Sequence, residues 1–286
     1  MDSKQNSDQM VEQKIKPMIE KIAQKKKVQE KMAKIKHKIM IMSGKGGVGK
    51  STVTANLATS MAKKGYKVGI LDSDIHGPSI PKILGIQGKR PETTKTGLQP
   101  VTTSQGVKVI SMDLLLPNRE TPLIWRGPLK LKAIRQILSD IEWGELDYLL
   151  IDLPPGTGDE PLNIIQLMPE MDGAIIITAP SDLSQYVVRK AVQMARRMNV
   201  PIIGIIENMS GFICPKCGEK YEILGSGGGE KLSQETNLPL LGQIPIDPQI
   251  TENSDQGIPF VTNVSESQTV KIFNEIVQRI QETIEK

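Results

Sequence analysis

One stretch of the chain carries a complete phosphate-binding pattern: Gly44-Lys45-Gly46-Gly47-Val48-Gly49-Lys50-Ser51-Thr52. It matches the spacing G-x-x-x-x-G-K-[ST] and adds a second lysine, Lys45. An apolar run of strand length, Ile39–Met42, precedes the stretch, and apolar residues at helical spacing follow it. A glycine-rich turn between a strand and a helix directs backbone N–H groups and the positive end of the helix dipole at one place. The pattern therefore predicts a loop that binds a nucleoside triphosphate.

The residue types in this loop suit the chemistry of a nucleotide. The glycines let phosphate oxygens approach the backbone closely, because no Cβ stands in the way. Lys50 is predicted to reach the β- and γ-phosphates, and the Ser51 hydroxyl is predicted to bind Mg²⁺. We assign the whole loop to nucleotide binding: Gly44, Lys45, Gly46, Gly47, Val48, Gly49, Lys50, Ser51 and Thr52.

The composition is typical of a cytoplasmic enzyme. The chain has 286 residues, of which 38% are hydrophobic and only 3% aromatic, so an aliphatic core is expected. No apolar run approaches the length of a membrane span, and no apolar signal region follows the N-terminus. Two cysteines in a chain of this length do not form a disulfide framework, which favours a reducing compartment. We expect a cytoplasmic protein without a membrane span.

The net charge of +4 is concentrated at the N-terminus. Residues 1–38 contain 11 lysines and five acidic residues, which leaves 25 basic and 27 acidic residues for the remainder. The body is therefore nearly neutral and gives no argument for nucleic-acid binding. Apolar residues follow alternating steps of four and three in this arm, with a break around Lys25-Lys26-Lys27: Val11, Ile15, Met18 and Ile22, then Val28, Met32 and Ile35. They predict an amphipathic helix, starting near Pro17, that packs on the body or a second copy, or contacts an anionic surface.

The remainder of the chain alternates short apolar runs with helical patterns. The predicted strands are Lys67–Leu71, Val107–Met112, Tyr148–Ile151, Ala174–Thr178, Ile202–Ile206 and Leu240–Ile244. The predicted helices include Pro128–Ile141, Gln185–Met198, Gly229–Thr236 and Gln268–Glu285. The strands are apolar throughout, as expected when helices cover both faces of a sheet. We predict a doubly wound α/β fold with a mostly parallel sheet. It forms one P-loop domain over residues 38–286, preceded by a lysine-rich helical arm over 1–37. Within the domain, Gly85–Gln105 is predicted to be a loop or small hairpin.

Aspartates stand where predicted strands end, which is where ligands of such sheets gather. Asp152 follows an aliphatic strand and is a candidate to hold Mg²⁺, directly or through water. Asp74, in Leu71-Asp72-Ser73-Asp74, is a candidate to orient or deprotonate the attacking water. An aspartate at a strand end often only forms a turn or caps a helix, so both assignments depend on the neighbouring P-loop.

The two cysteines form a C-x-x-C pair, Cys214 and Cys217. They supply half of a tetrahedral thiolate site, and the sequence contains no other cysteine. A two-fold dimer would bring four thiolates together, enough for one [4Fe–4S] cluster or one zinc ion. Spacing alone leaves zinc, a dithiol redox pair and a cluster open, although the pair does not open a helix in a thioredoxin-like βαβ pattern.

The chain carries seven motifs between about Ile39 and Phe260: Gly44–Thr52 with its extra lysine, Asp72-Ser73-Asp74-Ile75-His76-Gly77-Pro78-Ser79, Trp125-Arg126-Gly127-Pro128, Asp152-Leu153-Pro154-Pro155-Gly156-Thr157-Gly158-Asp159, Glu207-Asn208-Met209-Ser210, Cys214-Pro215-Lys216-Cys217 and Ile244-Pro245-Ile246-Asp247-Pro248. With them the chain resembles the Mrp/ApbC-type iron–sulfur cluster carrier ATPases, relatives of the nitrogenase iron protein and of the cell-division site-selection ATPases. It departs from that family at His76, where tyrosine is frequent, and in the glycine run Gly225–Gly229. It also lacks the N-terminal four-cysteine motif of some members, which excludes a second, stable cluster.

The resemblance implies more than the spacing does. Lys45 would reach the nucleotide of the opposite subunit in a homodimer, and Asn208 would read the adenine edge, with Pro245 and Asp247 flanking the base. Cys214 and Cys217 would hold a labile [4Fe–4S] cluster across the dimer for transfer to apo iron–sulfur proteins. The implied cofactors are ATP, Mg²⁺ and the cluster, with Lys45, Lys50 and Asp74 serving slow ATP hydrolysis.

Two alternatives remain open on the sequence. A positioning or partitioning ATPase would have the same P-loop but no need for the cysteines. A zinc-bridged dimer would use the cysteines and treat ATP as a conformational switch, because four thiolates accept zinc as readily as iron.

Overall fold

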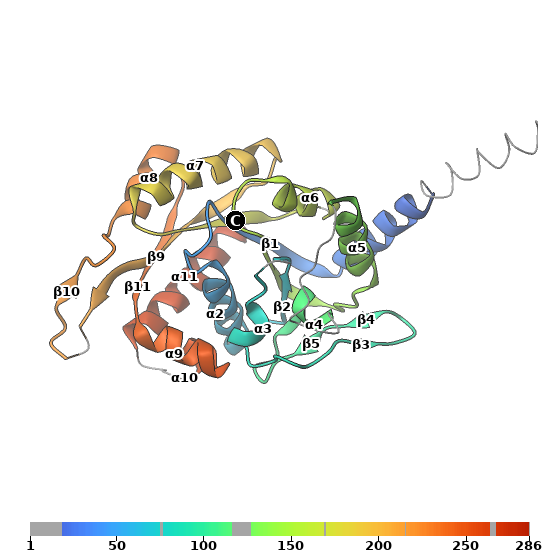
Figure 1. Cartoon of the computed structure of the whole chain (residues 1–286), viewed down its shortest axis with the longest axis horizontal. Coiled ribbons are helices and arrows are strands. Elements are labelled where there is room, and N and C mark those ends of the chain that lie inside the picture. Colours follow the sequence, from blue (N-terminus) through green and yellow to red (C-terminus); the bar gives the residue numbers. More distant parts are fainter. Residues whose placement is uncertain are drawn as a thin grey trace, which may run out of the picture.

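The computed structural model describes residues 19–74, 77–115, 127–168, 170–214, 216–263 and 267–285, with side chains left out at 127–133 and 182–185. Within these ranges a nine-stranded sheet runs through the centre, and helices cover both of its faces (Figure 1). The predicted doubly wound α/β fold with a mostly parallel sheet is confirmed.

The sheet places the P-loop strand in its middle. In spatial order the strands are β10 (Lys220–Tyr221), β9 (Ile202–Ile213), β8 (Gly173–Thr178), β1 (Ile35–Ser43), β7 (Leu146–Asp152), β2 (Val68–Asp72), β6 (Lys108–Ser111) and β5 (Val101–Thr102), and β11 (Leu240–Ile246) also pairs with β9. Strands β10 and β5 pair antiparallel with their neighbours, and all other pairs in this sheet are parallel. The carboxyl ends of β1, β7 and β2 therefore meet at one edge.

The strands are apolar throughout because their side chains point alternately into two hydrophobic cores, one on each face of the sheet. In β1, Ile39 and Ile41 point into one hydrophobic core, whereas Met40 and Met42 point into the other. All four side chains are buried. A strand with a solvated face would alternate apolar and polar residues, so this burial explains the continuous apolar pattern.

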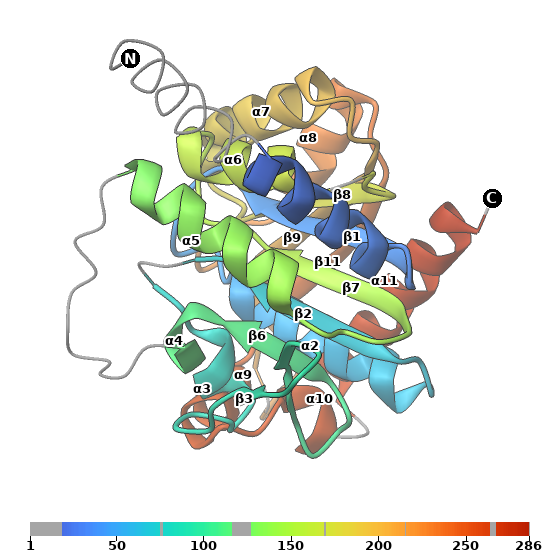
Figure 2. The same cartoon turned by 90° about the vertical axis from the view of Figure 1, so that its right-hand side faces the viewer.

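Each core lies between the sheet and its own layer of helices (Figures 1 and 2). The first layer contains α2 (Lys50–Lys63), α3 (Ile80–Ile83), α4 (Met112–Leu115), α9 (Pro248–Gln256), α10 (Phe260–Asn263) and α11 (Gln268–Ile284). The second contains α5 (Gly127–Asp140), α6 (Asp159–Leu167), α7 (Asp182–Arg197), α8 (Gly228–Thr236) and the N-terminal helix, described over 19–32. The predicted strands and helices all appear, with ends within a few residues of the predicted ones except in β9, which runs on to Ile213, beyond the predicted end at Ile206. Gly85–Gln105 contains the predicted hairpin, β3 (Glu92–Thr93) with β4 (Leu98–Gln99).

The N-terminal helix joins the body at its C-terminal end. Val28 and Met32 of the helix are buried in the second core, whereas Ile22 is 60% exposed. Ile35 is buried in the same core, but it begins β1, so the prediction that it belongs to the helix is wrong: the chain turns after Met32 and enters the sheet. Pro17, where the helix was expected to start, and the apolar positions before Ile19 lie outside the described residues. No helix in the described ranges is long and apolar enough to cross a membrane.

Candidate nucleotide and metal site

The predicted phosphate-binding loop joins the end of β1 to the start of α2 (Figure 1). Gly47 and Gly49 have φ angles of 80° and 77°, a left-handed conformation that glycine adopts without steric cost. At Gly44, a Cβ would lie 2.6 Å from the backbone carbon of Val187 in α7, so only glycine fits there. The loop therefore has the backbone shape that the motif predicts, with Lys50 as the first residue of α2.

The structure brings two predicted site residues, Lys50 and Ser51, together around a third, Asp152, and adds Thr54, which the sequence analysis did not assign. Lys50 Nζ lies 2.5 Å from Asp152 Oδ2, and Ser51 Oγ donates to the same oxygen at 2.6 Å. Thr54 Oγ1 donates to the other carboxylate oxygen at 2.7 Å. Asp152 is fully buried and Lys50 is 6% exposed, so this is a desolvated ion pair with its acceptors satisfied.

This cluster has the donor set that Mg²⁺ prefers. Ser51 Oγ and Asp152 Oδ2 are hard oxygen donors held within hydrogen-bond distance of each other beside the loop. The residues fit the predicted role of Ser51 and Asp152 as the groups that would hold Mg²⁺. When bound, Mg²⁺ would neutralise charge on the phosphates.

Asp72 is a buried group that the sequence did not assign to the site. It pairs with Asp152 in the register of β2 and β7, and it is 1% exposed. Burial, followed by the neighbouring charge of Asp152, raises the pKa of Asp72 from 3.8 to about 8, against the opposing effects of the Ser111 hydroxyl and Lys50. The sequence offers one sign of this, because an aspartate follows each of the two predicted strands. Only the strand order of the sheet shows that these two strands are neighbours and that the two aspartates meet.

Asp74 lies just beyond Asp72 in the turn after β2. Its Oδ1 accepts a hydrogen bond from the backbone N–H of Gly77 at 3.0 Å, and its own N–H donates to Asp72 Oδ1 at 3.2 Å. Ser73 ties this turn to β7, because its hydroxyl donates to the Asp152 carbonyl at 2.7 Å. His76 and the motif residues Trp125 and Arg126 lie outside the described residues. The role of Asp74 in orienting water stays a prediction.

The residues predicted to surround the base lie on β9 and β11. Asn208 Nδ2 donates to the Val48 carbonyl of the P-loop at 2.9 Å, which places this side chain at the nucleotide loop. Pro245 is buried on β11, next to the register partner of Asn208. Asp247 caps α9 by accepting from the N–H of Gln249 at 3.0 Å, and it also accepts from the Thr269 hydroxyl. Asp247 thus has a structural task, and its contact with a base stays a prediction.

The cysteines lie on a hairpin that extends β9 beyond the sheet. Lys220 pairs antiparallel with Ile213, and the backbone N–H of Cys214 donates to the Glu219 carbonyl at 2.9 Å. Cys217 is exposed and Cys214 partly exposed. The backbone N–H groups of Cys217 and Lys216, and then the Cys217 thiol, donate to the Cys214 sulfur and lower its pKa. A lowered pKa favours the thiolate, the form that binds metals.

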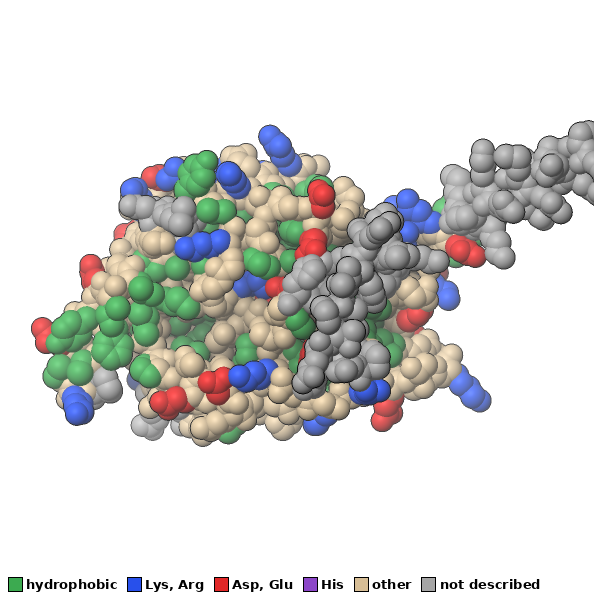
Figure 3. All heavy atoms as spheres, in the orientation of Figure 1, with side chains coloured by type: hydrophobic (Ala, Val, Ile, Leu, Met, Phe, Trp, Pro, Cys, Tyr) green, Lys and Arg blue, Asp and Glu red, His purple; other side chains and the backbone are tan. Residues whose placement is uncertain are grey.

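Exposed apolar side chains adjoin the cysteine hairpin. Tyr221, Ile223 and Leu224 are 46%, 62% and 51% exposed. Figure 3 shows hydrophobic side chains gathered on this side of the molecule, where Figure 1 places β10. No group of three or more His, Cys, Asp or Glu side chains able to hold a metal occurs within the described ranges. Metal binding by four cysteines therefore requires a second copy.

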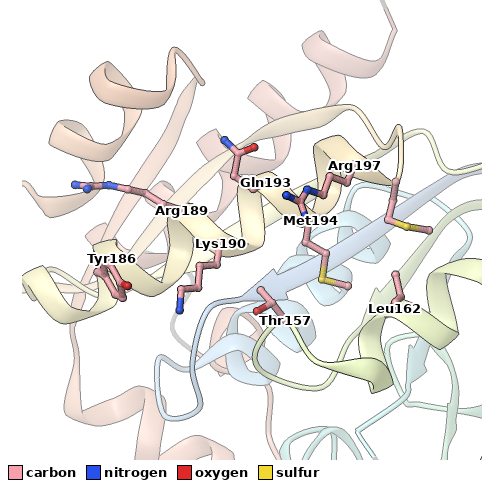
Figure 4. A pocket seen from close by; sticks show the side chains of 9 residues that line it. Thr157, Leu162, Tyr186, Arg189, Lys190, Gln193, Met194 and Arg197 are labelled. Atoms are coloured by element: carbon pink, nitrogen blue, oxygen red, sulfur yellow. The ribbon is translucent and has the colours of Figure 1, made fainter.

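A cavity of about 630 Å³ lies between α7 and the start of α6 (Figure 4). Its lining includes Arg197, Lys190 and Met194 of α7 and Thr157 from the loop after β7. None of the predicted nucleotide or metal ligands lines it. The P-loop has the backbone shape of its motif, so we keep the P-loop and the cysteines, and not this cavity, as the candidate site.

One protein family and several curated proteins are similar to this chain over most of its length. Residues 34–281 match the ParA family, described as NUBPL iron-transfer P-loop NTPase. The iron-sulfur cluster carrier protein of Methanocaldococcus jannaschii is 54% identical over 259 residues, covering 91% of this chain and 89% of that protein. The corresponding protein of Saccharolobus solfataricus is 50% identical over 259 residues, covering 91% and 88%.

Solved structures point the same way. A nucleotide-binding protein from Archaeoglobus fulgidus in complex with ADP has a TM-score of 0.75 and 43% identity, covering 84% of this chain and 93% of that one. The MinD cell division protein of Aquifex aeolicus has a TM-score of 0.62 at 22% identity, covering 86% and 97%, which shows the shared fold alone.

Proposed function

The chain belongs to the ParA-type family of NUBPL iron-transfer P-loop NTPases, and we propose that it is an ATP-dependent carrier that delivers a labile [4Fe–4S] cluster to apo-proteins. One observation carries the proposal. Strand β9 contacts the P-loop through Asn208 and continues into the hairpin of Cys214. A positioning ATPase needs no metal ligands, whereas this strand joins a nucleotide loop to a pair of thiols.

A homodimer completes the metal site. Each chain supplies Cys214 and Cys217 and no other cysteine, so a cluster with four thiolate ligands needs two chains. The cluster is cargo in this scheme. The exposure of Cys217 on the hairpin suits transfer, because an acceptor's thiols could approach a cluster held there from solvent.

ATP binding begins with an exchange of partners at Lys50. Its ammonium group would leave the Asp152 carboxylate for the β- and γ-phosphates, and the Asp152 and Ser51 oxygens are the groups that would hold Mg²⁺. Lys45, half-buried in the loop, reaches the nucleotide of the opposite subunit, and Asp74 orients the attacking water. Hydrolysis is slow, as in P-loop switches that lack an activating partner.

The carrier function is tested by transfer. The protein is reconstituted anaerobically with iron and sulfide, freed of excess reagents, and mixed with an apo [4Fe–4S] enzyme whose activity reports cluster arrival. We expect activity to rise with the carrier and to stay absent with a Cys214→Ser/Cys217→Ser double variant. Bound zinc without iron uptake would favour the zinc-bridged dimer instead.

The assignment of Asp74 has its own test. Asp74→Asn should bind ATP with parental affinity and hydrolyse it more slowly, because the water loses its orienting carboxylate. Hydrolysis at the parental rate would remove Asp74 from the mechanism.

A further inference from the structure

Strand β9 carries a bulge between the nucleotide loop and the cysteine hairpin. Along β11, Ile244 pairs with Asn208 and Ile246 pairs with Phe212. An advance of two residues on β11 therefore corresponds to an advance of four residues on β9. The bulge, Met209–Gly211, contains two left-handed residues, Met209 with φ 60° and Gly211 with φ 69°. Among the described residues that are not glycine, Met209 shares this conformation only with two asparagines, the residue type that tolerates it best. A bulge bends its strand, and this one sets the direction in which the hairpin leaves the sheet.

On its N-terminal side the bulge is fixed to the P-loop. Asn208 is 7% exposed, and its amide donates to the Val48 carbonyl at 2.9 Å. A Cβ at Gly49 would overlap the Asn208 amide, so the side chain packs directly against the loop backbone. A displacement of the loop at Val48 and Gly49 would therefore carry Asn208 with it.

The segment through which the chain returns from the hairpin to α8, Gly225–Gly229, is called the returning arm here. It is fixed by Glu207, the residue before Asn208 on β9. Glu207 is fully buried, and its carboxylate accepts hydrogen bonds from the backbone N–H groups of Gly227, at 3.2 Å, and Gly229. The arm is also joined to the bulge, because the Gly211 N–H donates to the Gly225 carbonyl at 3.2 Å. Both ends of the hairpin thus meet at one place on β9, between Glu207 and Gly211.

We propose that the bulge Met209–Gly211 is the hinge through which a nucleotide in the P-loop sets the orientation of the cysteine hairpin, with Glu207 as the positioning residue that holds the hairpin's returning arm. The inference rests on the proposed function, because it requires a nucleotide in that loop. Met209 suits this task because a residue with a side chain has only a narrow left-handed region available to it. A rotation at Asn208 is then passed to the hairpin, whereas glycine would absorb it through its wider range of φ and ψ.

The test is amide hydrogen exchange of residues 211–225 in the full-length protein free of iron and zinc, with and without Mg²⁺ and a non-hydrolysable ATP analogue. Analogue binding is measured by calorimetry on the same samples. In the parent we expect the analogue to change exchange in the hairpin. Met209→Gly should bind the analogue with parental affinity and lose most of this nucleotide-dependent change. Asn199→Gly is the matched control, because it places glycine at another left-handed position, φ 54°, outside the hinge, and it should keep the full change.

A second variant tests the returning arm. Glu207→Gln keeps one oxygen acceptor but replaces the other with an amide nitrogen that cannot accept from a backbone N–H. It should bind the analogue and lose the nucleotide-dependent change, because the returning arm is no longer held.

Two results would overturn the hinge and leave the proposed function standing. These are analogue binding without any change of exchange in the parent hairpin, and a full parental change in Met209→Gly. Failure of the parent to bind the analogue at all would overturn the proposed function and the hinge together.

Discussion

Asp72 and Asp152 lie side by side at the carboxyl ends of the parallel strands β2 and β7, and both are buried. Lys50 Nζ lies 2.5 Å from Asp152 Oδ2, and Lys50 also lowers the pKa of Asp72. Burial and the Asp152 charge nevertheless raise the pKa of Asp72 to about 8. Asp72 therefore holds its proton at neutral pH.

This arrangement predicts how stability depends on pH. The pKa of Asp72 is raised from 3.8 to about 8 on folding, so its contribution is fully present below about pH 4 and is lost as the pH rises to 8. Asp72→Asn removes this titration while keeping an oxygen acceptor for the Ser111 hydroxyl. We expect a gain in unfolding free energy on the order of 1–3 kcal/mol at pH 8 and a smaller one at pH 5, measured by denaturant unfolding. An equal effect at both pH values would contradict the assignment.

Removing Lys50 is expected to affect stability as well as ATP binding. Lys50→Ala takes the charge partner from the phosphates and leaves the Asp152 carboxylate buried without its cation. The second effect should destabilise the nucleotide-free protein by about 3–5 kcal/mol, and adding Asp152→Asn should recover much of this loss. Lys82→Ala is the matched control, because its 2.6 Å pair with Asp255 is exposed and should contribute about 0–1 kcal/mol. Similar losses for Lys50→Ala and Lys82→Ala would argue against a buried pair.

Lys45 tests whether hydrolysis depends on the partner subunit. A lysine that stabilises transition-state charge in trans contributes on the order of a thousandfold in rate. Lys45→Ala should bind ATP nearly normally and hydrolyse it poorly. In a mixed dimer with Lys50→Ala, the Lys45→Ala chain keeps a functional loop and receives Lys45 from its partner, so one of the two sites should recover. Mixed dimers that are no more active than the separate variants would show that Lys45 does not act in trans.

The two cysteines should differ in reactivity. Cys217 is the more exposed, but hydrogen bonds lower the pKa of Cys214, and thiolate is the form that reacts. With limiting iodoacetamide at neutral pH, the reduced, metal-free protein should be labelled first at Cys214, as identified by peptide mass spectrometry. Faster labelling of Cys217 would mean that exposure outweighs the lowered pKa of Cys214.

The sequence predicts the fold well where local patterns suffice. The nucleotide loop and the apolar strands β1, β7 and β8 have signals within ten residues, and all appear as expected. Strand β9 runs on to Ile213, well beyond the predicted Ile206, because its polar residues Glu207 and Asn208 are buried by partners distant in sequence. A local pattern cannot show such partners.

The sequence likewise predicts one part of the candidate site and not the other. The grouping of Lys50, Ser51 and Asp152 follows from a motif and a strand end, whereas the raised pKa of Asp72 depends on which strands are neighbours. Helix α9 was missed although Asp247 and Pro248 form a cap and first-turn signal that the sequence displays.

Two chains are expected to share one cluster through Cys214 and Cys217, and the iron content per chain of the reconstituted dimer measures this directly. The protein is reconstituted anaerobically, sized in solution, and analysed for iron, sulfide and zinc. We predict a brown dimer with about four irons per two chains, as one cluster on four thiolates requires. Cys214→Ser and Cys217→Ser should each lose the colour and still bind ATP. A full cluster retained by either single variant, or a monomer that carries one, would contradict the account.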